Sequence, residues 1–157
     1  MRKLVKMVLI KRIARLLICL CLLAGTLAAV TPVTARGQAD VSLLPSVLSV
    51  GVGDEFEVKV QVESGSQAVT GVGAYLDFDS TRLMVMDADS TQPGVQITPG
   101  LVFPLVIENE VDNSAGQIDF SAGTVNKPFP SGTLVLATIR FKALVPAVPA
   151  TAVTFST

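Results

Sequence analysis

Carboxylates are the side chains in this sequence that could do chemistry. Histidine is absent from all 157 residues, and the two cysteines, Cys19 and Cys21, lie near the amino terminus. The rest of the chain therefore cannot use Ser-His-Asp or Cys-His catalysis, or imidazole and thiolate metal sites. Paired carboxylates could still hydrolyse a glycosidic bond, and Asp77 and Asp79 share one face of a predicted strand. We expect them to be solvated surface and turn acids, and the protein not to be an enzyme.

Asp87 and Asp89 are the other carboxylates whose spacing suggests a ligand site. The segment Asp87-Ala-Asp-Ser-Thr91 offers oxygen atoms at alternate positions, as calcium sites do. It lacks the glycine and the distal glutamate of a helix-loop-helix calcium site, so an acidic loop is the favoured interpretation. Calcium stays open as an alternative, and no cofactor is predicted.

The first 35 residues have the layout of a secretory signal peptide. Basic residues precede an uncharged, leucine-rich stretch of 15 residues from Leu16 to Val30, and small residues follow it. This pattern predicts cleavage after Ala35, or as late as Ala39. The apolar stretch is shorter than the ~20 residues that a membrane-spanning helix needs. We therefore predict a signal peptide helix, a secreted or cell-surface protein, and no membrane contact after cleavage.

Cleavage changes the charge of the protein. Six of the 12 basic residues leave with residues 1–35 and none of the 13 acidic residues do, so the net charge becomes −7. A protein with this charge repels the phosphate backbone, and we expect no nucleic-acid partner. The remaining chain has no cysteine, so its stability outside the cell cannot depend on disulfides.

Residues 40–157 indicate one all-β domain. Short alternating runs recur between clusters of Gly, Pro, Asp and Ser, which is typical of a β-sandwich. Strands are predicted at 41–50, 56–63, 72–78, 83–86, 101–107, 117–122, 133–143 and 153–155. The stretches 87–100 and 108–116 are predicted as a loop and a turn-rich acidic connection. In 133–143 the predicted inner face consists of Val135, Ala137, Ile139 and Phe141.

The stretch from Gly71 to Met86 predicts a strand, a tight turn and a second strand. Apolar residues alternate with glycine, tyrosine and aspartate as far as Phe78, with the period of two that a half-buried strand shows. We expect Leu76 and Phe78 to be buried. Tyr75 and Asp77 should then stand in solvent on the opposite face.

Three stretches resemble the cohesin domain family. The strand that ends in Phe78-Asp79, with its short turn and Leu83-Met-Val85, is similar to the family's third and fourth strands. Gly51-Val-Gly-Asp54 resembles the lead into the second strand, and residues 132–142 resemble the motif Gly-x-Leu-Ala-Thr-Ile-x-Phe. The resemblance covers about 41–155 and implies a jelly-roll β-sandwich.

The resemblance implies a non-catalytic module that binds a dockerin and so assembles polysaccharide-degrading or cell-surface complexes. In cohesins one sheet face, built from the third, fifth, sixth and eighth strands, contacts the dockerin. The positions that this implies here are Gly71, Gly73, Tyr75, Asp77, Glu108, Gln117, Asp119 and Ser121. Better-known members carry polar groups where Gly71 and Gly73 stand.

The resemblance also implies a further strand after 153–155, so the chain is expected to be a truncated or incomplete copy. Two other functions stay open, a carbohydrate-binding module of a secreted polysaccharide-active protein and a structural module of a surface protein. Aromatic platforms for a sugar are few, since there is no Trp and one Tyr. Among the seven Phe, only Phe129 lies where exposure is expected. The predicted partner is a dockerin-type module or a polysaccharide.

Overall fold

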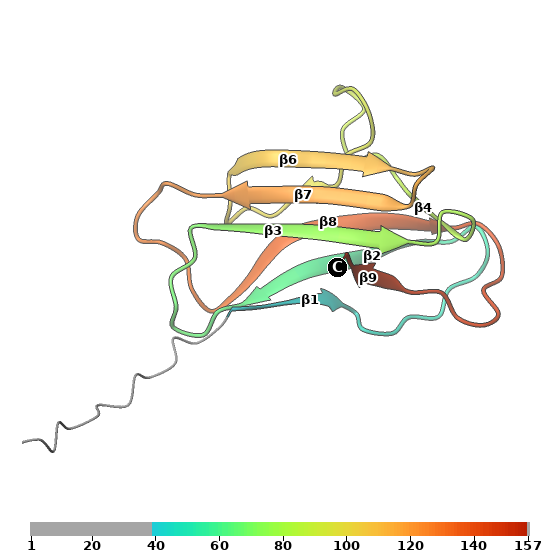
Figure 1. Ribbon diagram of the computed structural model, residues 1–157, viewed down its shortest axis with the longest axis horizontal. Coiled ribbons are helices and arrows are strands. Elements are labelled where there is room, and N and C mark those ends of the chain that lie inside the picture. Colours follow the sequence, from blue (N-terminus) through green and yellow to red (C-terminus); the bar gives the residue numbers. More distant parts are fainter. Residues whose placement is uncertain (1–38, 157) are drawn as a thin grey trace, which may run out of the picture. The chain divides into compact units, whose positions relative to one another are not determined.

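The computed structural model describes residues 39–156, and this part of the chain is built from nine β-strands (Figure 1). The strands are β1 (Asp40–Leu44), β2 (Glu55–Glu63), β3 (Gly71–Phe78), β4 (Leu83–Val85), β5 (Thr98–Pro99), β6 (Leu105–Asp112), β7 (Gln117–Gly123), β8 (Thr133–Ala143) and β9 (Val153–Phe155). The signal peptide predicted at 1–35 and the strand predicted after 153–155 lie outside the described residues. Within 39–156 there is no helix long and apolar enough to cross a membrane.

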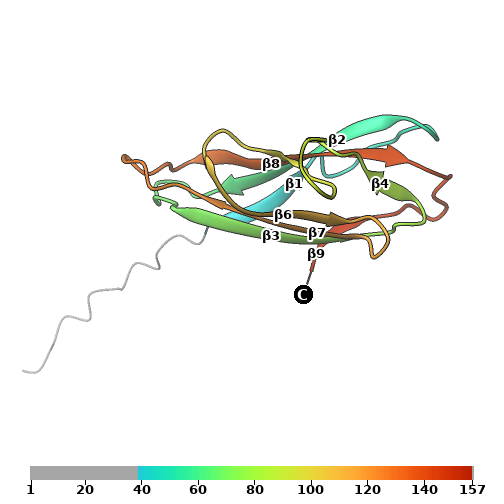
Figure 2. The same ribbon diagram turned by 90° about the horizontal axis from the view of Figure 1, so that it is seen from above.

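The strands form two antiparallel sheets that pack face to face, as Figure 2 shows from above. The five-stranded sheet has the order β1-β2-β8-β4, and β5 pairs with β8 beside this path. The four-stranded sheet has the order β6-β7-β3-β9. The chain passes from one sheet to the other after β2, β3, β5, β7 and β8, so the predicted all-β jelly-roll sandwich is confirmed.

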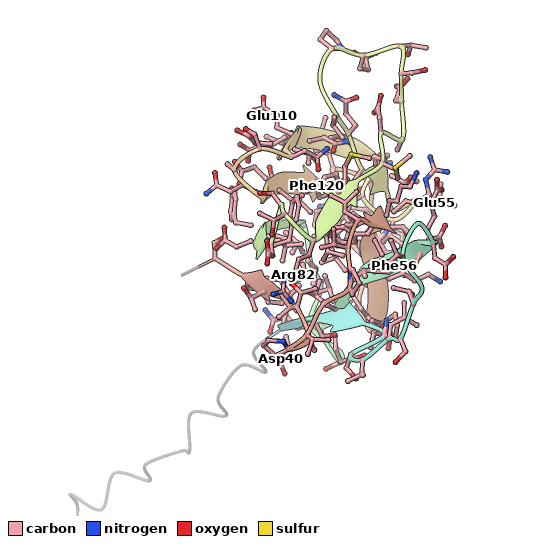
Figure 3. The ribbon with its side chains drawn as sticks, turned by 90° about the vertical axis from the view of Figure 1, so that its right-hand side faces the viewer. Asp40, Glu55, Phe56, Arg82, Glu110 and Phe120 are labelled. Atoms are coloured by element: carbon pink, nitrogen blue, oxygen red, sulfur yellow. The ribbon has the colours of Figure 1, made fainter. Side chains whose placement is uncertain are left out.

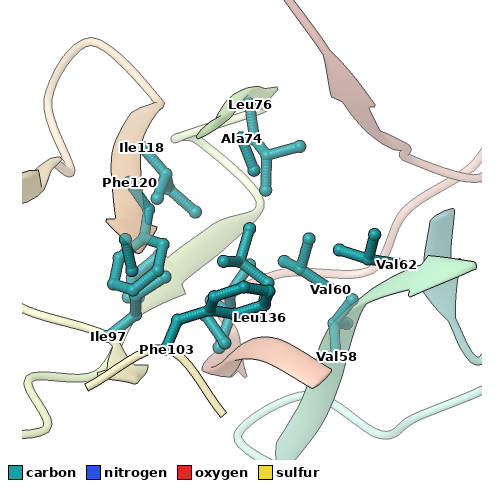
Figure 4. Packing of buried hydrophobic residues seen from close by; sticks show 14 of the residues in the cluster. Val58, Val60, Val62, Ala74, Leu76, Ile97, Phe103, Ile118, Phe120 and Leu136 are labelled. Carbon is teal, nitrogen blue, oxygen red and sulfur yellow. The ribbon is translucent and has the colours of Figure 1, made fainter. Parts of the chain in front are cut away.

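The core lies between the sheets and comes from the alternating apolar residues (Figure 4). Its members on the central strands are Val58, Val60, Val62, Ala74, Leu76, Phe78, Ile118, Phe120, Leu136, Ile139 and Phe141. Phe141 packs against Phe78 edge-on, with ring centroids 5.5 Å apart, and stacks on Phe56 at 5.7 Å. Leu76 is 1% exposed and Tyr75 is 47% exposed, which confirms the predicted register of β3.

Two predicted strands differ from the observed ones by more than one residue at an end. β1 ends at Leu44 rather than at Val50, because Pro45 has no backbone N–H to continue the ladder. The fifth predicted strand was placed at 101–107, whereas β6 begins at Leu105 and continues to Asp112 through the predicted acidic connection. The preceding turn inserts Phe103 into the core with no exposed surface, while Leu101 remains 98% exposed.

A β-bulge in β8 changes which residues of that strand face the core. Val60 pairs with Ala137 and Gln61 pairs with Val135, so Leu136 is an extra residue in the ladder with β2. Leu136 and Ala137 are both fully buried, while Val135 is only half-buried. The prediction that Val135 faces inward was therefore wrong, because a bulge shifts the alternation by one residue.

The loop between β4 and β6 closes against this bulge. The Gly100 N–H donates to the Leu136 carbonyl at 2.8 Å, and Thr98 and Pro99 pair with Thr138 and Ala137. A Cβ atom at Gly100 would lie 2.0 Å from the Val135 carbonyl oxygen, so only glycine fits there. The predicted loop at 87–100 thus contains strand β5.

Gly100→Ala should destabilise the domain strongly, because backbone must shift to relieve the contact with Val135. We expect a loss of about 2–4 kcal/mol in the free energy of unfolding, the range typical of severe strain and core disruption. Gly71→Ala is the matched control, because its Cβ would meet Ala122 O at an ordinary 3.5 Å. Urea melts of both variants check this, and equal stability of the two would contradict it.

Candidate functional site

The outer face of the four-stranded sheet brings together the residues singled out in the sequence. Across the β3–β7 ladder the outward pairs are Gly71 with Gly123, Gly73 with Ser121, Tyr75 with Asp119, and Asp77 with Gln117. Glu108 of β6 stands opposite Ser121 on the other side of β7. Apart from Gly123, which is buried, these residues are half-buried or exposed, whereas the alternate residues of β3 and β7 point into the core. We call this surface the outer face.

Strand β6 adds residues to the outer face that the sequence reasoning missed. Leu105 stands opposite Gly123, Glu110 opposite Asp119, and Asp112 opposite Gln117. Figure 3 shows Glu110 at the periphery of the domain and Phe120 toward its interior. Glu110 and Asp112 were missed because 108–116 was predicted as a connection, and Leu105 was missed because the continuous apolar run at 101–107 does not show which side chains face outward. The alternation of Glu108, Glu110 and Asp112 with less polar neighbours was the available signal.

Tyr75 reaches across β7 to Glu108. Its hydroxyl donates a hydrogen bond to the Glu108 carboxylate at 3.3 Å. In the ladder, Ser121 lies between Gly73 and Glu108. The negative charge of Glu108, this hydrogen bond, some desolvation and Asp119 together raise the pKa of Tyr75. The phenol therefore stays protonated and acts as a donor at neutral pH.

Gly73 makes room for the tyrosine ring. A Cβ atom at Gly73 would lie 3.3 Å from Cε2 of Tyr75, so the ring leans over the bare glycine. An aromatic ring that covers a strand glycine shields backbone that would otherwise be exposed to water. No side chain covers Gly71 in this way, and Gly71 lies at one end of the outer face.

Comparison with known proteins identifies the fold family. The sequence profile of the cohesin domain matches residues 42–157, most of the chain. This chain belongs to the cohesin domain family. Among curated proteins none matches the sequence.

Solved cohesin structures resemble this one in fold at low sequence identity. A type II cohesin domain from the cellulosome of Acetivibrio cellulolyticus aligns with a TM-score of 0.63 at 14% identity, covering 76% of this chain and 75% of that one. A mutant type II cohesin-X-dockerin complex from the same organism gives 0.59 at 16%, with 76% and 78% covered. Type II cohesin A11 from Bacteroides cellulosolvens gives 0.59 at 17%, with 74% and 76% covered.

The acidic loop of this cohesin uses its carboxylates to organise its own backbone. Asp87 accepts hydrogen bonds from the N–H groups of Asp89 and Gln96, both at 3.1 Å. Asp89 accepts bonds from Thr91, which lower the pKa of its carboxyl. In residues 39–156 no group of three or more acidic residues could hold a metal ion, whereas calcium takes six to eight oxygens. The loop geometry gives the calcium alternative no support.

The Asp79 carboxylate likewise accepts hydrogen bonds from its own turn, the one after β3. Its carboxylate accepts hydrogen bonds from the Thr81 hydroxyl and N–H, and it lies 3.1 Å from the Arg82 guanidinium. The bonds from Thr81, and then Arg82, hold the pKa of Asp79 below its ordinary value. A glycosidase needs an acid with a raised pKa to protonate the leaving group, and Asp79 has the opposite shift.

The aromatic residues outside the core are scattered in this cohesin. Phe129, expected to be exposed, is half-buried, with the Lys127 ammonium 5.7 Å from its ring centroid. Phe155, placed in a strand pattern, is 38% exposed. Neither residue lies on the strands that form the central part of the outer face, where Tyr75 is the exposed aromatic side chain.

Ultraviolet titration of the single tyrosine tests the bond with Glu108, because the chain has no tryptophan to obscure the phenolate. Tyr75 should ionise above the ordinary pH of about 10. Its contribution to stability should be present below that pH and lost as the pH rises through the raised pKa. Glu108→Gln should lower the midpoint, and the exposed Glu57→Gln on β2 should not. A midpoint unchanged by Glu108→Gln would contradict the contact.

Proposed function

We propose that this cohesin is a non-catalytic module that binds a dockerin-type partner through its outer face. The observation that carries the proposal is that the positions implied by the family resemblance form one continuous surface across β3, β6 and β7. One similar structure is described as a complex of a type II cohesin with an X-dockerin from Acetivibrio cellulolyticus. That partner class is the one we assign to this chain.

Tyr75 is the proposed anchor of the contact. It lies near the middle of the outer face and is 47% exposed. Tyrosine is enriched among the few interface residues that carry most of the binding energy, because it buries a large rigid surface and keeps a polar tip. The Glu108 carboxylate already holds the ring in place, which lowers the entropy lost on binding.

A polysaccharide is the weaker candidate for this face. Sugars stack on flat aromatic side chains, and the outer face presents one tyrosine, whose hydroxyl is engaged with Glu108. A flat strip of several aromatic rings is not formed by β3, β6 and β7. These features favour a protein partner. We propose that the complex belongs to polysaccharide-degrading or cell-surface assemblies, as the family resemblance implies.

Export of the protein is the second part of the proposal, and it rests on the amino-terminal sequence. Residues 1–35 should direct secretion and then be removed after Ala35 or Ala39. Amino-terminal sequencing of secreted material should therefore begin at Arg36 or Asp40. Recovery of an intact chain beginning at Met1 in the membrane fraction would show that the segment is an uncleaved anchor.

Calorimetric titration with dockerin modules tests the partner. The probes are the X-dockerin of Acetivibrio cellulolyticus and every dockerin encoded in the genome that encodes this chain. Tyr75→Ala should weaken binding about 30-fold or more, the loss of ~2 kcal/mol that defines an interface anchor. Glu57→Ala, on the outer side of the five-stranded sheet, should leave the affinity unchanged.

Thermal melts of both variants establish that the comparison concerns binding rather than folding, because Tyr75 and Glu57 are exposed. Absence of binding to the whole dockerin panel, together with retention of the protein on insoluble cellulose, would favour the carbohydrate-binding alternative. If the protein bound neither a dockerin nor cellulose, the alternative of a structural module would be favoured.

A further inference from the structure

The chain between β4 and β6 forms a projecting loop, residues 88–96, which stands out beyond β6 at the top of Figure 1. The Ala88 N–H donates to the Gln96 carbonyl at 3.0 Å and closes this loop at its base. A pocket of about 640 Å³ lies between the projecting loop, β5 and the β6 residues Val106 and Asn109. Pockets that bind small molecules have volumes of roughly 300–1,000 Å³, so this one has the size of a ligand site.

The pocket lies on the opposite side of β6 from the outer face. Val106 stands opposite Ala122 and Asn109 stands opposite Phe120, and both of these partners are buried in the core. The outer-face residues of β6 point the other way, because side chains alternate along a strand. A ligand in the pocket would therefore leave the outer face free for a partner.

Gln96 lines the pocket and has a buried hydrogen-bond acceptor without a partner. Its side-chain N–H donates to the Pro93 carbonyl at 2.7 Å, which fixes the orientation of the amide, since the reverse orientation would bring two acceptor oxygens together. The other side-chain atom, Oε1, receives no hydrogen bond from residues 39–156. An unpaired buried acceptor is costly, so a ligand that donates a hydrogen bond to Oε1 would stabilise this loop.

The other polar groups of the pocket suit a neutral ligand that both donates and accepts. Asp89 is ionised at neutral pH, because the bonds from Thr91 hold the pKa of its carboxyl below the ordinary value. Thr98 and Gln92 can donate as well as accept. None of the residues within 39–156 that line the pocket is basic. A phosphate or carboxylate ligand would therefore be repelled by Asp89.

Apolar groups complete the lining. Pro93 and Pro99 contribute rigid rings, and Val106 is 39% exposed although it lies on the inward side of β6. A sugar ring combines apolar C–H groups with hydroxyls that donate and accept, so it matches both kinds of lining. A protonated amine would use the acceptors but would leave the donors of Thr98 and Gln92 unpaired.

We propose that this pocket binds a neutral sugar residue, with Gln96 Oε1 and the Asp89 carboxylate as acceptors for its hydroxyl groups. Pro93, Pro99 and Val106 would contact the C–H groups of the ring. The pocket has no flat strip of aromatic rings for an insoluble polysaccharide surface, so the ligand is a chain end or a short oligosaccharide. This inference does not rest on the proposed dockerin contact, which lies on the other side of β6.

Nitrogen-15 NMR titrations test the site with three neutral disaccharides, cellobiose, xylobiose and maltose. At least one of them should shift the Gln96 side-chain amide and the backbone amides of Ala88 and Thr98, and should leave Gly73 on the outer face unchanged. Glucuronic acid carries a carboxylate and should cause no shift, because Asp89 repels it. Lysine amide is the cationic probe and should bind more weakly than the sugar.

Two variants of the pocket and one control separate this site from general effects. Gln96→Met keeps the length of the side chain, removes the acceptor and should weaken sugar binding about fivefold, the share of a single hydrogen bond. Gln67→Met, in the exposed connection between β2 and β3, is the matched control and should leave the affinity unchanged. Thr98→Val removes an exposed hydroxyl at constant shape and should also weaken binding. It decides the question if loss of the Gln96–Pro93 bond disturbs the loop.

The outcomes separate this inference from the proposed function. Absence of a shift with all three disaccharides, shifts centred on the outer face, or tighter binding of lysine amide would each overturn the inference. Equal affinity of the wild type and both pocket variants would do so as well. A domain that binds a sugar in this pocket but no dockerin would support the inference while the proposed function failed. Binding of a dockerin without any sugar would have the reverse meaning.

Discussion

Two asparagine side chains, Asn109 in β6 and Asn113 in the turn after it, attach this strand to β4 and to the segment that leads into β5. The orientation of the outer-face residues depends on this attachment. The Asn109 amide exchanges two hydrogen bonds of 2.9 Å with the backbone of Ile97, and Asn113 does the same with Val85 at 2.8 and 3.0 Å. Because side chains alternate along a strand, an inward Asn109 places Glu108 and Glu110 outward. A slip of one residue would turn carboxylates toward the core, so these bonds also keep Glu108 and Glu110 on the outer face.

The sequence predicted the parts of the fold in which alternation is strict. β3 and β7 follow the pattern, and the positions inferred for the outer face on these strands do lie on one surface. Residues 108–112 of β6 escaped prediction because the inward residue Asn109 is polar and is satisfied by the backbone of Ile97, just before β5. The bulge at Leu136 was also hidden, since every residue from Leu134 to Ala137 is apolar and alternation cannot show a phase change there.

The outer face is arranged at some expense to the stability of the free domain. Asp119 and Glu110 are like charges directly opposite each other on neighbouring strands, an arrangement that disfavours pairing. Glycines within strands offer no side chain to pack. Tyr75 recovers part of this loss by covering Gly73 and donating to Glu108. The core beneath the outer face contains no such unfavourable arrangement and includes close aromatic contacts of Phe141 with Phe56 and Phe78. Locally unfavourable interactions on one face of a well-packed sandwich are typical of a binding surface.

Gly71 also has an evolutionary consequence. Its backbone conformation is open to any amino acid, and a side chain there would meet only an ordinary contact with Ala122. Mutations at this position can therefore change the proposed recognition surface while the sandwich stays intact. Two duplicated copies of this domain could diverge in partner choice through single substitutions at Gly71, with no compensating change in the core. The fold can therefore be conserved while the choice of partner changes.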